Sequence, residues 1–333
     1  MIENINNEGH SMYDLIKKLF PICRSITGNG TRNSLKIISK ILPIQIHEIS
    51  TDTEVFDWKI PKEWNINDAY IKNSSGEKIL DFKISNLHIL NYSSPIHKKI
   101  TLDELKDHIF TDSKHPDEIP YRTTYYSENW GFCMSHNQFL NLKDDIYEIF
   151  IDSTLEKGSL TYGEYFVKGK NDYEILFSCY ICHPSMCNDS LSGVALTVEL
   201  GEYIKNLEIN PNYSYRFLFI PETIGSITWL SQNKEKINKI KHGLVVTCVG
   251  DSGKMTYKKT RQNDTEINNT VISVLKESKK NHEILDFFPS GSDERQYCSP
   301  GINLEVGCLT RSMFTRYPEY HTSLDNLDLI TFD

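Results

Sequence analysis

The stretch EILFSCYICHPSMCNDSLSG, residues 174–193, decides the fold class of this chain. It opens with a compact apolar run of strand length, and a helical pattern follows over residues 192–207. His183 comes directly after the apolar run, and Asp189 comes six positions later. Alternating buried strands and helices are typical of α/β domains. We therefore expect an α/β domain in which polar side chains follow the end of this strand.

The same rhythm continues toward the carboxyl terminus. Apolar runs at residues 216–221, 243–250 and 302–309 have the composition of buried strands. Helical patterns separate them at residues 226–240 and 266–278. This alternation predicts a mixed, largely parallel sheet flanked by helices. In such sheets the chemistry gathers at the carboxyl ends of the strands.

The first half of the chain has two different sequence patterns. Residues 12–22 and 34–43 place apolar side chains three and four apart, which predicts two amphipathic helices. After about residue 55 the pattern changes to short β-rich runs, and four of the twelve prolines fall between residues 55 and 126. We therefore predict an α/β domain interrupted by a small α+β domain. The predicted boundaries are residues 1–55 plus 160–333 for the α/β domain and residues 56–159 for the inserted one.

Composition and charge exclude several classes of protein. The 333 residues allow two domains, and 39% hydrophobic residues argue against a disordered or fibrous chain. Lys and Arg number 36 against 45 Asp and Glu, whereas a nucleic-acid binder usually carries a basic face. No apolar run reaches the roughly 18–20 residues of a membrane span, and the amino terminus lacks a secretory pattern. We therefore expect a cytoplasmic protein without nucleic-acid or membrane partners, and a homo-oligomer stays open.

Side chains that bind metals follow the ends of the predicted strands. His183 and Asp189 follow the first strand, Glu222 follows the second, and Asp251 follows the third. His321 lies close to the carboxyl terminus. Two imidazoles and three carboxylates are the ligand chemistry of one Zn²⁺ ion or a pair of Zn²⁺ ions. We therefore expect one or two zinc ions at this edge of the sheet.

Each of these residues also has a simpler role open to it. A His after a strand is often a hydrogen-bonded loop residue, and Asp189 before a helix fits an N-cap. Glu222 fits a solvated carboxylate, and Asp251 between two glycines fits a turn. His321 can pair with Glu319 or Asp325. The metal hypothesis therefore depends on the joint arrangement, because unrelated polar residues need not fall at successive strand ends.

The eight cysteines offer a competing metal site or a nucleophile. In a chain without an export signal they are expected as reduced thiols or metal ligands, not as disulfides. Cys179 and Cys182 have CxxC spacing, with Cys187 nearby. Residues three apart on a strand point to opposite faces, and no second CxxC exists. The spacing therefore disfavours a cysteine-rich zinc site, and a Cys182 nucleophile is equally disfavoured because the adjacent His183 points away from it.

A polar loop near the carboxyl terminus supplies candidate substrate contacts. FPSGSDERQYCSPG, residues 288–301, is either an ordinary turn with a solvated acid–base pair or a wall that faces substrate. In the second case Ser292, Asp293 and Arg295 supply the contacts. Tyr320, next to the final histidine, is a further candidate. We take Asp293, Arg295 and Tyr320 as the predicted substrate-binding residues.

An aromatic cluster, YRTTYYSENWGF, occupies residues 121–132. Large aromatic side chains dominate the energetics of cores and interfaces. We expect this cluster in the core or at the interface between the two domains, and not in a binding site.

The order of these motifs resembles the di-zinc aminopeptidase superfamily, which includes bacterial leucyl aminopeptidases and glutaminyl cyclases. The similarity covers about residues 174–333. A closer resemblance is to an uncharacterised family of aminopeptidase-like proteins with an inserted small domain. The blocks that carry it are LFPICRSITGNGTR, FDWKIPKEW, CHPSMCNDSLSG, FPSGSDERQYCSPG and YHTSLDN.

The resemblance implies roles for individual residues. It implies three zinc ligands: His183 on one ion, Asp189 as the bridge and His321 on the other. The Glu-Glu pair of the superfamily falls on Glu222 and Thr223, so that Glu222 is the implied general base and Thr223 stands where a ligand is expected. Asp251 stands for the late acidic ligand, although it comes past the expected place. These departures leave open whether one or two zinc ions bind.

We therefore predict a zinc-dependent hydrolase of amide bonds that acts on a small peptide or amide, most simply an aminopeptidase-like metallopeptidase. Its mechanism would use metal-activated water, with Glu222 as the proton acceptor. One alternative is an amidase or deacylase with a non-peptide substrate such as an amino sugar, or an enzyme that cyclises a terminal residue, because fold does not decide the reaction. Another is a degenerate site that binds a metal or ligand without turnover, which Thr223 would suit.

Overall fold

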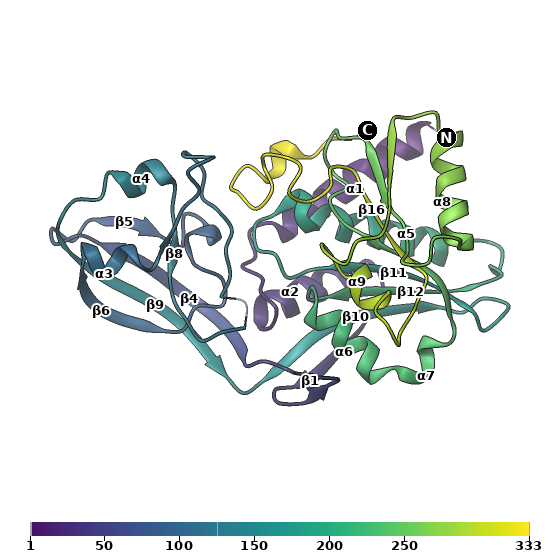
Figure 1. Cartoon of the computed structure of the whole chain (residues 1–333), viewed down its shortest axis with the longest axis horizontal. Helices are drawn as coiled ribbons and strands as arrows, with labels where there is room; N and C mark the ends of the chain where they lie inside the picture. The colour runs from purple at the N-terminus through teal and green to yellow at the C-terminus, as the bar shows by residue number, and fades with distance from the viewer. Residues whose placement is uncertain (1, 125, 333) are drawn as a thin grey trace.

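An eight-stranded mixed sheet forms the centre of the larger part of the molecule (Figure 1). The computed structural model describes residues 2–124 and 126–332. The strands of this sheet are β1 (Gln45–Ser50), β10 (Ser159–Val167), β11 (Glu174–Tyr180), β12 (Ser214–Ile220), β13 (Ile240–Val246), β14 (Met255–Lys258), β15 (His282–Leu285) and β16 (Val306–Thr310). Their spatial order is β1-β10-β12-β11-β13-β16-β14-β15, with four parallel strands in the middle and antiparallel joins to β10 and β14. The predicted mixed, largely parallel α/β sheet is therefore confirmed.

Helices cover both faces of this sheet. The first layer consists of α1 (Ile2–Leu19), α2 (Asn29–Ile38) and α5 (Gly193–Lys205), and the second includes α6 (Ile224–Gln232) and α9 (Glu294–Tyr297). Side chains alternate along β12. Phe217 and Phe219 therefore enter the first core, between the sheet and the first helix layer, whereas Leu218 and Ile220 enter the second core, on the opposite face. Among the described helices, none has both the length and the apolar run needed to cross a bilayer.

Several elements begin or end where the sequence pattern does not place them. The helix expected at residues 34–43 is α2 and starts earlier, at Asn29, because the side chain of Asn65 accepts a hydrogen bond from the Asn29 N–H at 2.7 Å. The helix expected at residues 226–240 breaks at Asn233 into α6 and α7 (Lys234–Ile237). The helix expected at residues 266–278 is α8 (Glu266–Glu277), so it lies where the pattern predicts it.

A second, four-stranded sheet is built between β1 and β10 of the chain. Its strands are β4 (Glu63–Lys72), β5 (Lys78–Asp81), β6 (Ile96–Thr101) and β9 (Ile146–Glu156), in the spatial order β5-β4-β9-β6. All three strand pairs are antiparallel, and the sheet has its own hydrophobic core. Short elements accompany it: α3 (Leu102–Lys106), β7 (Ile109–Phe110), β8 (Phe132–Cys133) and α4 (His136–Leu140). The hairpin of β2 (Glu54–Val55) and β3 (Trp58–Lys59) precedes it and packs against the core of the main sheet that contains α6. The sheet lies inside the predicted insertion, whose boundaries at residues 56 and 159 stay a prediction.

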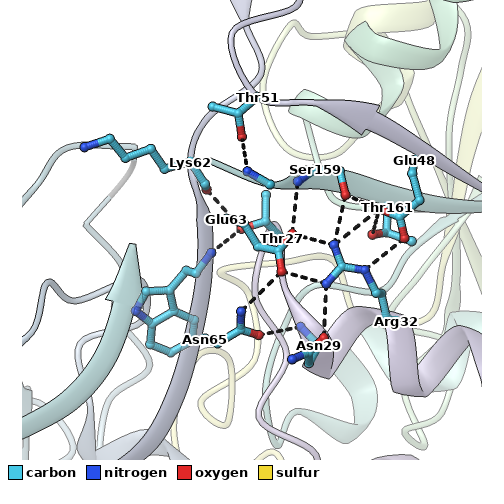
Figure 2. A network of polar contacts seen from close by, with 12 residues as sticks. Thr27, Asn29, Arg32, Glu48, Thr51, Lys62, Glu63, Asn65, Ser159 and Thr161 are labelled. Carbon is cyan, nitrogen blue, oxygen red and sulfur yellow. Dashed lines mark hydrogen bonds and ion pairs between the residues drawn. The ribbon is translucent and has the colours of Figure 1, made fainter. Parts of the chain in front are cut away.

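A half-buried arginine, Arg32, joins the two sheets (Figure 2). Arg32 of α2 donates from Nε to Glu48 of β1 at 2.9 Å, from Nη1 to Glu63 of β4 at 2.7 Å, and from Nη2 to Ser159 of β10 at 2.9 Å. The hydrogen bond from Arg32 lowers the pKa of Glu63 to about 2 against the effect of its burial. This charged network therefore ties the first strand of the second sheet to the edge of the main sheet.

Candidate metal centre and substrate cavity

Three side chains that are far apart in the sequence converge beyond the carboxyl end of β11. His183 lies in the loop after that strand, and Asp189 lies in the helical turn Cys187–Ser192 that leads into α5. His321 lies in the loop after β16. Each of the three offers a ligand atom, and these atoms all lie within 4.8 Å of one another. The structure therefore brings together three of the four predicted ligands.

Two of the converging atoms pair only with each other among the described residues. Nε2 of His321 lies 2.9 Å from Oδ2 of Asp189. Both atoms are buried, and neither has a hydrogen bond to any other described residue. Two imidazoles and one carboxylate are a donor set that zinc accepts. A cation bound by these side chains would give the buried Nε2 and Oδ2 atoms a further partner.

The protonation of the cluster also suits a cation. Burial lowers the pKa of His183 to about 4, and nearby His321 and Arg24 lower it further against the attraction of Asp189. Burial alone would raise the pKa of Asp189, but His183 and His321 outweigh that effect and lower it to about 2. At neutral pH the imidazole is therefore neutral and the carboxylate ionised, as metal ligands must be.

Hydrogen bonds from neighbouring groups orient Asp189. The hydroxyl of Tyr180 donates to its Oδ1, and Thr247 in turn donates to the Tyr180 oxygen at 2.8 Å. The carboxylate of Asp325 accepts from the backbone N–H groups of Asn188 at 2.5 Å and Asp189 at 2.9 Å. Asp325 is thus a partner of the Asp189 backbone. Such outer partners fix the orientation of a ligand.

A fully buried arginine holds the backbone of His183. Arg24 is 0% exposed, and its Nη2 donates to the His183 carbonyl at 2.6 Å while its Nη1 donates to the Leu19 carbonyl at 2.5 Å. Burial lowers the pKa of Arg24 to about 10, so that it keeps its charge at neutral pH. The amino-terminal segment after α1 therefore helps to place the first ligand.

The inserted segment holds the backbone of His321. The N–H of Tyr121 donates to the His321 carbonyl at 2.7 Å, and Pro120 pairs with Thr322 as an antiparallel bridge. The Tyr121 ring centroid lies 5.0 Å from that of His183 and 5.0 Å from that of His321. The inserted segment thus contributes directly to the site. This contribution could not be seen from the sequence, because Tyr121 and His321 lie far apart along the chain.

The predicted general base stands beside the cluster. Oε2 of Glu222 lies 3.9 Å from Nε2 of His183. Burial raises the pKa of Glu222 well above its ordinary value, and the carboxyl groups of Asp293 and Asp189 raise it further. The next residue, Thr223, accepts a hydrogen bond from Nη2 of Arg295 at 2.9 Å. Its hydroxyl is therefore engaged with Arg295.

Asp251 is the predicted ligand that the structure does not bring to the cluster. β13 ends at Val246, so Asp251 follows in a turn several residues beyond the strand. Its Oδ2 accepts from the Asn188 side chain at 2.6 Å, and its Oδ1 accepts from the Gly253 N–H at 2.6 Å. These contacts fit the alternative role of Asp251 as a turn residue.

The cysteines do not enter the group of candidate ligands. All eight are free, and the group formed by described residues contains none of them. Cys179 packs in the first core, whereas Cys182 accepts a hydrogen bond from the Glu222 N–H at 3.3 Å. Burial raises the pKa of the Cys182 thiol well above its ordinary value, and Glu222 raises it further. Cys182 is thus a buried, protonated thiol at neutral pH.

A cavity of about 310 Å³ opens beside the cluster. His183, His321 and Glu222 line it together with Arg295 and Tyr320, two of the predicted substrate contacts. Its aromatic walls are Trp58, Tyr121, Tyr126, Tyr180, Phe314 and Tyr320.

Asp293, the third predicted substrate contact, lies behind the cavity wall. Asp293 is buried, and its Oδ1 accepts from the Thr223 N–H at 2.7 Å and from Ser226 at 2.8 Å. The aromatic cluster is split between two places. Tyr121 and Tyr126 line the cavity, contrary to expectation, whereas Phe132 lies in the core of the second sheet as expected, and Tyr125 lies outside the described residues.

Comparisons with known proteins agree with this architecture. A family model described as a domain of unknown function (DUF4910) matches residues 13–333. A protein of Clostridium acetobutylicum, whose description names polysaccharide biosynthesis and an aminopeptidase-like domain, is 56% identical over 326 residues, which are 98% of this chain and 74% of that relative.

Solved structures extend the likeness to zinc peptidases. A crystal structure from Clostridium acetobutylicum, provisionally described as a peptidase, matches with a TM-score of 0.96 at 55% identity over 100% of this chain and 78% of that chain. A zinc aminopeptidase from Bacillus subtilis matches with a TM-score of 0.69 at 12% identity over 97% of this chain and 90% of that chain. At such low identity the second likeness is one of fold, and at that level the resemblance seen in the sequence is confirmed.

Proposed function

Since this chain belongs to the family described as a domain of unknown function (DUF4910), we propose its function from the site itself: a zinc-dependent hydrolase of amide bonds. The observation that supports it best is the convergence of His183, Asp189 and His321, in which two buried ligand atoms pair only with each other among the described residues. A carboxyl group and an adjoining cavity complete the set of parts that hydrolysis of an amide needs.

Each described group then has a task in the reaction. Zinc, when bound, polarises the scissile carbonyl and lowers the pKa of water from 15.7 to roughly 7. Oε2 of Glu222 takes the proton from the attacking water and returns it to the leaving nitrogen. Tyr180 keeps Asp189 oriented through its hydroxyl, and the Tyr121 ring packs against both histidines.

We propose that the site holds one zinc ion. Thr223 has no ligand oxygen of carboxylate type, and its hydroxyl is already bonded to Arg295. Asp251 bonds to Asn188 and Gly253. Three protein ligands remain, and three ligands with one open position are typical of catalytic zinc, whereas structural sites are closed by four.

A non-peptide amide is the second candidate substrate. The relative from Clostridium acetobutylicum is described with polysaccharide biosynthesis as well as an aminopeptidase-like domain. An acylated amino sugar has the same amide bond as a peptide, so the same residues would serve a deacylase. The two candidates differ in substrate and not in the zinc centre.

Metal analysis combined with an activity screen tests the proposal. Purified protein is dialysed against zinc, washed and analysed for metal, and then assayed on peptides, aminoacyl anilides and acylated amino sugars. We expect about one zinc per chain in the native protein and a large loss in Asp189→Asn. Asp251→Asn is the matched control, because it removes a buried carboxylate outside the cluster, and it should keep its zinc.

The possible outcomes separate the alternatives. A folded native protein that takes up no zinc contradicts the proposal and favours a binding module. Zinc uptake without hydrolysis of any amide in the screen contradicts the enzymatic part of the proposal. Cleavage of acylated amino sugars alone selects the deacylase.

A further inference from the structure

The cavity beside the metal cluster has one permanent positive charge. Among the residues that line it, Arg295 is the single Lys or Arg. Its Nη2 donates to the Thr223 hydroxyl at 2.9 Å, whereas its Nε is buried without a hydrogen-bond partner among the described residues. A guanidinium carries five donors, so most of the hydrogen-bonding capacity of Arg295 is unused.

The neighbouring acids do not neutralise this guanidinium by contact. Arg295 forms no ion pair with any carboxylate in the described part of the chain. Oδ1 of Asp293 accepts from Thr223 and Ser226, its buried Oδ2 has no hydrogen-bond partner among the described residues, and Glu222 lies beside His183. Burial raises the pKa of both carboxyl groups, and the charge of Arg295 lowers it in part. Arg295 is therefore available to an anionic group that enters the cavity.

A buried ion pair fixes the segment that carries Arg295. Lys258 and Glu294 form an ion pair with both side chains 0% exposed. Nζ of Lys258 also donates to the Ser290 carbonyl at 2.7 Å and lies 4.1 Å from the centroid of the Phe288 ring. These contacts hold the residues before and after Gly291 to β14. A positive group that is held in place before binding loses little freedom when its partner arrives.

The rest of the cavity suits an organic acid better than an amine. Glu222 is the only Asp or Glu among its lining residues, and it has the task of accepting a proton. A substrate that presents a free ammonium group would have only this carboxyl as a charged partner. Aromatic faces from Trp58, Tyr126 and Phe314 offer apolar contact for the remainder of the molecule.

We propose that Arg295 binds a carboxylate of the substrate, so that this cavity selects amides with a free carboxylate close to the scissile bond, such as N-acyl amino acids. The reaction rests on the function proposed above, but the recognition does not. Hydrolysis adds one water across the C–N bond and yields a carboxylic acid and an amino acid. The substrate polarity is then opposite to that of an aminopeptidase, which recognises a free amino terminus.

Equilibrium binding tests the recognition without any turnover. A series of N-acetyl amino acids with aliphatic, aromatic and acidic side chains is titrated by calorimetry into the full chain treated with chelator, and each acid is compared with its carboxamide. Hydrogen bonds to a charged group contribute about 1.5–3 kcal/mol, which is a factor of about 10 to 150 in affinity. We expect at least one acid in the series to bind about tenfold tighter than its carboxamide.

Three variants connect this preference to Arg295. In Arg295→Met the preference for the acid should vanish, and in Arg295→Lys it should be partly kept, because the charge remains but the paired donors are lost. Arg316→Met is the matched control: Arg316 is exposed and pairs with Glu283 outside the cavity, so its loss should change nothing. Thermal unfolding of each variant verifies that it is folded.

The results separate failure of this inference from failure of the proposed function. Equal binding of acid and carboxamide, no binding of any probe, or a preference that survives in Arg295→Met overturns the inference. A preference that depends on Arg295 in a protein that takes up no zinc supports the inference and contradicts the hydrolase.

Discussion

Replacing Arg24 by Met removes a buried cation that joins the amino-terminal segment to His183, the first proposed metal ligand. Arg24 makes two short hydrogen bonds, to the carbonyl groups of His183 at 2.6 Å and Leu19 at 2.5 Å. In the variant both carbonyl groups lose a charged donor, and the Leu19 carbonyl keeps only the Ile22 N–H at 3.1 Å. Hydrogen bonds from a charged group contribute about 1.5–3 kcal/mol each, so two of them set an upper range of about 3–6 kcal/mol.

The net loss of stability should be smaller than that range. Nε of Arg24 is buried without a hydrogen-bond partner among the described residues, and removing it relieves part of the cost of burying the charge. We expect Arg24→Met to lower the free energy of unfolding by about 2–4 kcal/mol, which leaves a folded protein if the domain has ordinary stability of about 5–15 kcal/mol. Urea denaturation followed by circular dichroism measures this change.

The same variant should weaken zinc binding, and this effect distinguishes positioning from simple support of the fold. Removing groups that orient a ligand typically costs about 10- to 100-fold in metal affinity. Competition with a chromophoric chelator measures that affinity. Arg261→Met is the matched control, since Arg261 also donates to a carbonyl, that of Cys298 at 2.8 Å, but lies outside the cluster. Unchanged zinc affinity in a destabilised Arg24→Met protein would refute the reasoning.

Three further predictions follow from other contacts. The pKa of Glu63 is lowered from 4.5 to about 2, so its contribution to stability is full above pH 4.5 and is lost as the pH falls toward 2. Urea denaturation between pH 2 and 7 should therefore show a weaker acid dependence in Glu63→Gln than in the native protein, and equal curves would contradict this. Tyr180→Phe removes the hydroxyl that donates to Asp189 and should reduce zinc affinity by about tenfold, measured by chelator competition. Lys258→Met leaves Glu294 as an unpaired buried carboxylate and should cost about 3–5 kcal/mol in urea denaturation, whereas a cost below 1 kcal/mol would exclude a charged pair there.

The features that were predictable from sequence depend on local patterns. Apolar runs of strand length placed His183 and Glu222 at strand ends, and the topology of parallel strands then brings such residues to one edge of the sheet. The outer strands β1 and β10 were not predicted, because their sequences mix polar and apolar side chains and their pairing with other strands lies far away in the sequence.

The features that were missed depend on contacts between distant segments. Arg24, Tyr121 and Tyr180 carry no local pattern that points to a metal centre, because their partners lie elsewhere in the chain. Asp251 shows the opposite case: its position after a strand fits a ligand, but the structure bonds it to Asn188, several residues beyond the end of β13. Local spacing therefore predicts where a site lies better than it predicts which side chains complete it.

A crystal of this chain grown with zinc, with anomalous data collected on both sides of the zinc absorption edge, tests the central claim most directly. The account predicts one anomalous peak about 2.0–2.2 Å from Nε2 of His321 and Oδ2 of Asp189, with a nitrogen of His183 as the third protein ligand. No peak at this position, or a peak bound by Asp251 or by cysteine sulfur instead, would contradict it.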